Sequence, residues 1–89
     1  MSDRFDEIRA AIDATDLALV GLVNERLRLV AELGEIKRSQ GSDHVDPGRE
    51  RALRAALVAA NDGPLSDEGL DRLVTELLAL TKREVGGRP

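Results

Sequence analysis

Apolar residues in the N-terminal part of the chain recur with the alternating spacing of three and four positions that a long helix presents to a neighbouring helix. This row, called the seam below, is completed by Thr15 and Arg26 at two further positions. No proline interrupts it, and Gly41 is typical of the residue that ends a helix. The pattern predicts one helix over about residues 4–39. The apolar seam residues are Phe5, Ile8, Ile12, Leu19, Leu22, Leu29, Leu33 and Ile36.

Two shorter helices are predicted in the rest of the chain, over about residues 47–61 and 66–85. Asp46 followed by Pro47 is typical of a helix N-cap and first helical position, and Ser66 is a second N-cap. An Asn-Asp-Gly-Pro turn at 61–64 separates the two helices. Thr81 interrupts the apolar stripe of the last one. No segment has a strand pattern, so residues 1–89 form one all-α domain. The stripe residues are Leu70, Leu73, Val74, Leu77, Leu78 and Val85.

The first helix is too long for a compact monomer. Phe5 to Ile36 spans about 48 Å at 1.5 Å per residue. A compact chain of 89 residues has a radius of gyration of about 12 Å. The two shorter helices cannot cover the seam as well as each other. We therefore expect three helices per chain in an intertwined helical-bundle homodimer. The alternative is a monomer whose long helix bends or breaks near Gly34.

Composition excludes several classes of function. The chain has no Cys, one His and a formal net charge of −4. Disulfides, cysteine nucleophiles and cysteine-ligated metals are therefore excluded, and a His-rich metal site is not expected. No segment has the pattern of a membrane span or a signal peptide. A pI of about 4.9 argues against nucleic-acid binding. We expect a cytoplasmic protein with neither a membrane nor a nucleic-acid partner.

One basic residue lies on the seam and two others lie near it, although an apolar residue is expected at seam positions. Arg26 stands on the seam, where a charge is costly unless it is paired or binds a ligand. Lys37 lies within about 20° of the same helix face and about 16 Å further along, so the two side chains can close on a small anion. Arg9 is about 25 Å from Arg26 in its own helix, but it lies beside Arg26 of the partner subunit in an antiparallel dimer. The alternative for Arg26 is a snorkelling side chain or an ion pair with a neighbouring glutamate.

Taken together, these residues resemble the all-α (type II) chorismate mutases, from about Ile8 to Thr81. Each interval between the motifs is common, but the ordered set ending in D-P-x-R-E is specific. The resemblance implies the family fold of three helices per chain, intertwined as a dimer with two active sites. The matching motifs are Ile8-Arg9-x-x-Ile12-Asp13-x-x-Asp16, Leu22-Val23-x-Glu25-Arg26, Gly34-x-Ile36-Lys37 and Val45-Asp46-Pro47-Gly48-Arg49-Glu50.

The resemblance also implies a reaction, the rearrangement of chorismate to prephenate by a [3,3] pericyclic shift in aromatic amino acid biosynthesis. Such a step needs no nucleophile, metal or cofactor. By resemblance, Arg26 and Arg9 of the partner subunit bind the two carboxylates of the substrate. Lys37 donates to the ether oxygen and to an adjacent carboxylate.

The other implied contacts come from the second and third helices. Asp46 and Glu50 are expected near the ring hydroxyl, with Arg49 lining the pocket beside them. Thr81 takes the place of a hydroxyl that contacts a carboxylate. Val85 departs from the family, because many members carry Gln or Glu there to hydrogen-bond the ether oxygen. Some short intracellular members with incomplete C-terminal ends are weak alone and are activated by docking on the first enzyme of the shikimate pathway, so the resemblance suggests the hypothesis of a similar complex here.

Two alternatives to the mutase remain open. An isochorismate pyruvate lyase shares the helical framework and the cationic pocket, although the acidic Asp46-x-x-Arg49-Glu50 set favours the mutase. A non-catalytic helical dimerisation or regulatory module would keep the fold without binding a dicarboxylate.

Overall fold

The computed structural model describes residues 3–41 and 48–86, and these residues form three α-helices and no strand. Helix α1 spans Asp3–Ser39, α2 spans Arg49–Ala60 and α3 spans Asp67–Val85. The predicted all-α fold with three helices per chain is confirmed. Asp46 and Pro47, which were predicted to open the second helix, lie outside the described residues.

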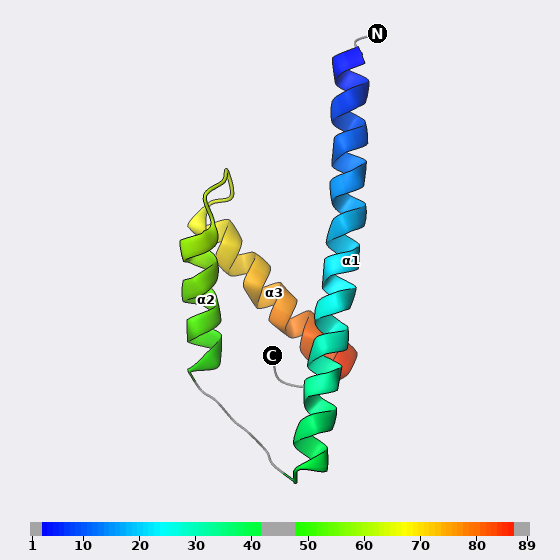
Figure 1. Ribbon diagram of the computed structural model, residues 1–89. Coiled ribbons are helices and arrows are strands. Elements are labelled where there is room, and N and C mark those ends of the chain that lie inside the picture. Colours follow the sequence, from blue (N-terminus) through cyan, green and yellow to red (C-terminus); the bar gives the residue numbers. More distant parts are fainter. Residues whose placement is uncertain (1–2, 42–47, 87–89) are drawn as a thin grey trace.

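Helix α1 is one unbroken rod of 37 residues, which corresponds to about 55 Å. It does not break near Gly34. The molecule measures 61 × 24 × 18 Å with a radius of gyration of 16.8 Å, well above the value of about 12 Å for a compact chain of this length. The N-terminal half of α1 projects beyond the other two helices (Figure 1). The single chain is therefore elongated rather than globular.

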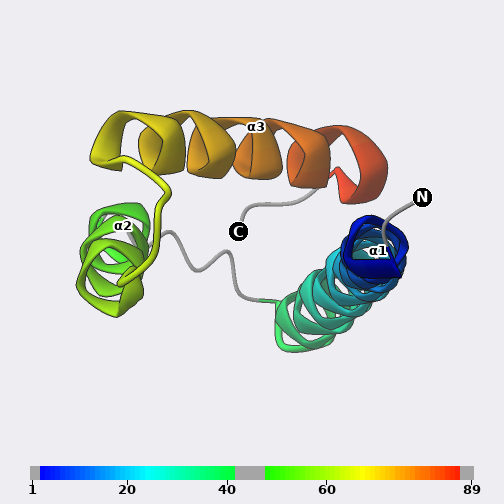
Figure 2. The same cartoon turned by 90° about the horizontal axis from the view of Figure 1, so that it is seen from above.

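Helix α3 connects the other two helices. It packs against both α1 and α2, whereas α1 and α2 do not pack against each other within the described residues (Figures 1 and 2). The buried residues Leu70, Val74 and Thr81 follow one line along α3. Leu73, predicted on the same stripe, is exposed because it lies to the side of that line. The core of the single chain is thus little more than one face of α3.

The start of α3 and the end of α1 agree with the expected signals, whereas α2 begins at Arg49 with Gly48 as its N-cap, two residues later than predicted. The Gly69 N–H donates to Ser66 Oγ at 3.0 Å, which confirms the N-cap of α3. Gly86 closes α3 in the left-handed conformation with φ of 70°, and its N–H donates to the Lys82 carbonyl at 2.8 Å. Gly41, just beyond α1, has φ of 63°. The caps of α3 therefore set where this helix begins and ends.

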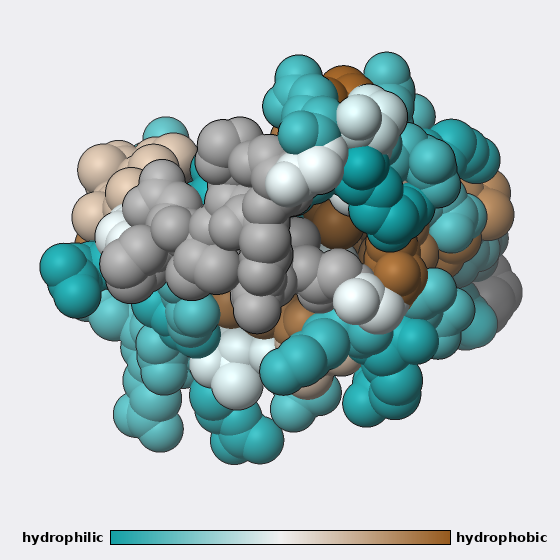
Figure 3. Space-filling model, turned by 90° about the horizontal axis from the view of Figure 1, so that it is seen from below, coloured by the Kyte–Doolittle hydropathy of each residue, from teal (hydrophilic) through white to brown (hydrophobic). Residues whose placement is uncertain are grey.

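The seam is left uncovered in the single chain. Its apolar side chains are all exposed, from 39% for Leu33 to 67% for Leu22. Figure 3, seen from the end of the molecule where α1 terminates, shows patches of apolar surface among mostly hydrophilic residues. An apolar row of this length is typical of a surface that another chain covers. No helix among the described residues is both long and apolar enough to cross a membrane.

Candidate functional site

Arg26 links α1 to α3 through a buried hydroxyl. Its Nη1 donates to Thr81 Oγ1 at 2.5 Å, and Thr81 has an exposed fraction of 0%. The Thr81 hydroxyl in turn donates to the Leu77 carbonyl at 2.8 Å. A hydroxyl has one proton to donate, so this bond leaves the oxygen to act as an acceptor toward Arg26. Thr81 therefore fixes the position of the Arg26 guanidinium at the crossing of the two helices.

Within the described residues, no carboxylate forms an ion pair with Arg26. Two of its neighbouring glutamates are engaged elsewhere on α1: Glu25 pairs with Arg28 at 3.4 Å, and Glu35 pairs with Arg38 at 2.5 Å. This arrangement disfavours the structural ion pair considered above. Burial, and then the positive charge of Arg49, lower the pKa of Arg26 below its ordinary value. A cation whose charged form is disfavoured in this way is suited to binding an anion.

The half-buried residues of α1 all lie in its C-terminal half, and Lys37 is the last of them. Lys37 and Arg26 thus share the side of α1 that the fold partly covers, about 16 Å apart along the axis. This agrees with the shared face expected from their spacing. The half-buried residues are Val23, Arg26, Leu27, Val30, Gly34 and Lys37.

Arg9 lies on the projecting half of α1, away from the other predicted residues. It is exposed, and its guanidinium carbon is 5.6 Å from the centre of the Phe5 ring. A cation at this distance from a ring is attracted to it. Because α1 is straight and continuous, Arg9 stays about 25 Å from Arg26 of its own chain. One chain alone does not bring these two arginines together.

Arg49 and Glu50 form the first turn of α2, and Glu50 is connected to α3 through Arg54. Arg54 donates to Glu50 Oε1 from Nε at 3.3 Å and from Nη2 at 3.1 Å. It also reaches α3, where Nη1 donates to Asp71 Oδ1 at 2.6 Å and Nη2 donates to Thr75 Oγ1 at 3.2 Å. Arg54 is not among the residues predicted from sequence, although its i,i+4 spacing from Glu50 was an available signal.

Val85 is the final residue of α3, half-buried and one turn after Thr81. Its side chain has no hydrogen-bonding group. The neighbouring Glu84 is exposed and lies about 100° around the helix from Val85, so its carboxylate does not take the place of that side chain. Asp46, the remaining predicted site residue, lies outside the described residues.

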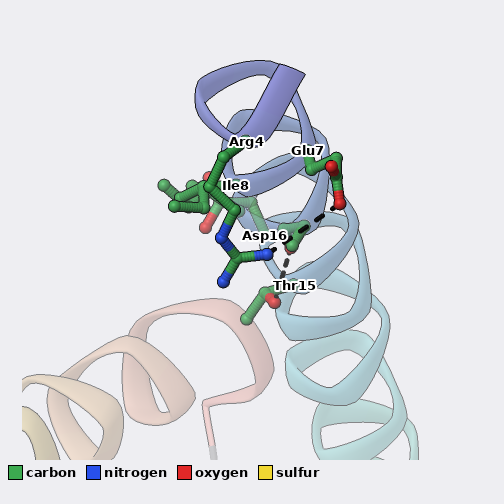
Figure 4. Close-up of a pocket in the computed structure, with 7 residues that line it drawn as sticks. Arg4, Glu7, Ile8, Thr15 and Asp16 are labelled. Carbon is green, nitrogen blue, oxygen red and sulfur yellow. Dashed lines mark hydrogen bonds and ion pairs between the residues drawn. The ribbon is translucent and has the colours of Figure 1, made fainter. Parts of the chain in front are cut away.

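An open groove runs along the N-terminal half of α1 and is lined by that helix alone (Figure 4). Arg4 and Glu7 form an ion pair at 3.9 Å on one side of it, and the Thr15 hydroxyl donates to the Ala11 carbonyl at 2.8 Å. The lining includes Ile8 and Ile12 of the seam, but none of the predicted site residues. The groove is therefore part of the uncovered seam and not an enclosed substrate pocket.

Comparison with known sequences identifies relatives along almost the whole chain. The family described as chorismate mutase type II matches residues 8–85. A bifunctional chorismate mutase/prephenate dehydratase of Neisseria gonorrhoeae is 37% identical over 84 residues, which cover 89% of this chain and 22% of the relative. One from Stutzerimonas stutzeri is 26% identical over 83 residues, covering 88% and 23%. The chain thus spans less than a quarter of the length of these curated relatives.

Solved structures of chorismate mutase also resemble this chain. Form II of the chorismate mutase structure from Thermus thermophilus superposes with a TM-score of 0.82 at 32% identity, covering 94% of this chain and 96% of that one. Form I superposes with a TM-score of 0.79 at 34% identity, covering 89% and 99%. The likeness extends over nearly all of both chains, so it includes the arrangement of the three helices.

Proposed function

Because this chain belongs to the chorismate mutase type II family, we propose that it rearranges chorismate to prephenate. The observation that carries the proposal is the state of Arg26. Its guanidinium is half-buried and held by Thr81, and both burial and the charge of Arg49 lower its pKa. A bound anion offsets both of these costs. Chorismate is a dicarboxylate and supplies such a charge.

The proposed reaction suits a site that is built from cations. In the [3,3] shift, the bond from the ether oxygen to the ring breaks while a carbon–carbon bond forms in the same molecule. No group leaves and no proton is transferred, so the protein has to select a reactive conformer and stabilise the charge that develops at the ether oxygen. Enzymes typically lower the activation free energy of their reaction by about 8 kcal/mol or more. Cations that are held away from water contribute to this stabilisation of the transition state, because their electric fields are weakly screened.

Each predicted residue has a role in the proposal. Arg26 binds one carboxylate with the planar fork of its guanidinium. Lys37, on the same face of α1, donates to the ether oxygen and to an adjacent carboxylate. Glu50 accepts a hydrogen bond from the ring hydroxyl, with Asp46 near the same group. Arg49, whose charge acts on Arg26, contributes to the proposed site from the first turn of α2.

Thr81 contributes by holding Arg26 before the substrate arrives. Its proton is directed to the Leu77 carbonyl, so a direct contact with a substrate carboxylate requires the hydroxyl to turn away from Leu77. Val85 lies beside it and offers the ether oxygen no donor. We therefore propose that Lys37 is the main group at that oxygen.

A homodimer is the second part of the proposal. The exposed seam and the projecting half of α1 support a second copy packed antiparallel along α1. In that arrangement Arg9 of the partner subunit lies beside Arg26 and binds the other carboxylate. Each site is then built from both chains, and neither chain is complete alone.

An activating complex with the first enzyme of the shikimate pathway is the third part. Its support is Val85, because a site without the usual Gln or Glu is expected to be slow by itself. Adding that enzyme should raise the steady-state turnover of this chain. An unchanged rate would exclude the activating complex but not the other two parts of the proposal. The cytoplasmic location expected from the sequence stays a prediction that cell fractionation would check.

The direct test supplies the purified chain with chorismate and, separately, with isochorismate. We expect chorismate to be consumed and prephenate to appear, with Arg26→Met as the inactive control. Release of pyruvate from isochorismate instead would identify a lyase. If neither substrate reacts and neither shifts the unfolding temperature, the chain is a non-catalytic helical module.

A further inference from the structure

We propose that Arg54 is a positioning residue, which holds Glu50 in place and sets its distance from Arg26 by anchoring α2 to α3. This inference rests on the proposed function, in which Glu50 meets the ring hydroxyl of the substrate. Arg54 does not touch the substrate in this scheme. It acts through Glu50.

The hydrogen bonds of Arg54 distinguish it from an ordinary surface arginine. Its side chain is 28% exposed, whereas that of Glu50 is 54% exposed. An isolated exposed i,i+4 pair is worth only about 0.3–0.5 kcal/mol and leaves both side chains mobile. Here the guanidinium is also bound to Asp71 Oδ1 at 2.6 Å and Thr75 Oγ1 at 3.2 Å, so α3 fixes its orientation. Arg54 therefore presents Glu50 with a donor that is already in place.

The bonds from Arg54 to Glu50 fall on one oxygen. Both Nε and Nη2 of Arg54 donate to Oε1, so Arg54 does not occupy Oε2. The lone pairs of Oε2 are the ones that can accept a hydroxyl of the substrate while Arg54 keeps its hold on Oε1. The positive charge of Arg54 also offsets repulsion between the Glu50 carboxylate and a substrate that carries two more carboxylates.

The position of Arg54 matters because α1 and α2 do not pack against each other within the described residues. Because α3 packs against both of the other helices, side-chain hydrogen bonds to α3 help to set the distance between Glu50 and Arg26. One connection is Arg54 to Asp71 and Thr75, and the other is Arg26 to Thr81. Thr75 and Thr81 are separated by about 9 Å along α3. Helix α3 acts as a spacer between the group proposed for the hydroxyl and the group proposed for a carboxylate.

The experiment compares steady-state kinetics of Arg54→Met and Arg54→Lys with those of the wild-type dimer on chorismate. Arg51→Met, on an exposed position of the same helix, is the matched control. We expect Arg54→Met to lower kcat by about 10- to 100-fold, as misplacement of a catalytic group does, while KM changes less than about threefold. Arg54→Lys should lose less, because one ammonium can still bond to Glu50. Arg51→Met should match wild type.

A double-mutant cycle with Glu50→Gln separates positioning from general stability. The Gln side chain keeps a carbonyl acceptor, so residual turnover remains. If Arg54 acts through Glu50, adding Arg54→Met to Glu50→Gln lowers kcat by less than about twofold. Circular dichroism and the unfolding temperature identify the assay temperatures at which every variant is folded.

Two results would overturn the inference while leaving the proposed function intact. One is an active wild type with Arg54→Met within about twofold of it in kcat. The other is an equal loss from Arg54→Met in the wild-type and Glu50→Gln backgrounds, because that pattern belongs to a residue with a structural role only. A wild type that makes no prephenate under any condition would remove both proposals.

Discussion

Arg26 on α1 and Thr81 on α3 are 55 residues apart in sequence, and a hydrogen bond of 2.5 Å joins them across the helix crossing. The bond places a guanidinium beside a hydroxyl with an exposed fraction of 0%, in a chain that has few buried residues of any kind. Burial and the charge of Arg49 both disfavour the charged form of Arg26 and lower its pKa. A guanidinium in such surroundings is typical of a site that binds an anionic ligand.

Replacing Arg26 by Met should abolish turnover without weakening the fold. The substitution removes a charge that the folded state disfavours, while Thr81 keeps its bond to the Leu77 carbonyl. A lowered pKa means that the folded protein releases this proton more readily than the unfolded chain does, so the effect of the charge changes only at strongly basic pH. The unfolding midpoint should therefore be equal or higher at both pH 6 and pH 9. A clearly lower midpoint, measured by thermal denaturation, would contradict this expectation.

The variants Thr81→Val and Thr81→Ser should differ in stability and in turnover, although each changes the size of the side chain only slightly. Valine removes the acceptor of Arg26, and we expect a loss of about 1–2 kcal/mol in unfolding free energy together with a fall in turnover. Serine keeps the hydroxyl and should retain most of the activity. Chemical denaturation and initial rates measure both effects. Equal activity in the two variants would show that the hydroxyl is not used.

A mixing experiment tests whether the two arginines of a site come from different chains. Arg9→Ala and Arg26→Ala homodimers should each be inactive. In a refolded equal mixture, about half of the dimers are hybrids, each with one intact site, so activity should return to about a quarter of wild type. No recovery, in a mixture shown to contain hybrids, would place Arg9 and Arg26 outside a shared site.

A charge on the seam should disrupt the dimer. Leu22 is on the seam and 67% exposed in the single chain, so Leu22→Asp should shift sedimentation or light scattering toward monomer. Leu17 is 76% exposed but lies on the opposite face of α1, so Leu17→Asp is the matched control and should remain dimeric. The interface is elsewhere if Leu22→Asp stays dimeric.

Val85→Gln should speed the reaction by restoring a donor near the ether oxygen. Val85 is half-buried and one turn after Thr81, so an amide at this position lies on the same side of α3. One added hydrogen bond in the transition state should raise kcat by about tenfold, and Val85→Leu should not. The same assay with chorismate measures both variants. A rate that does not rise would indicate that the ether oxygen lies elsewhere.

The sequence alone was sufficient for the three helices, the Ser66 cap, the end of α1 and the apolar seam. Periodicity, the Ser66 cap and the glycine at 41 act over a few residues, so local pattern reports them directly. The length of the first helix also predicted that the two shorter helices leave its seam uncovered, because the rise per residue of a helix is constant. The family resemblance then predicted the chemical roles of Arg26, Lys37 and Glu50. It did not predict which residues contact them in the folded chain.

Only the tertiary structure decided which groups touch. The partner of Arg26 could have been a nearby glutamate, and the packing of α3 on α1 selected Thr81 instead. The bonds from Arg54 to α3 likewise depend on how α2 lies against that helix, since Asp71 and Thr75 are 17 and 21 residues away in sequence. Side-chain hydrogen bonds depend on distances of a few tenths of an ångström. Spacing within one helix does not contain that information, because it is set by the packing of one helix on another.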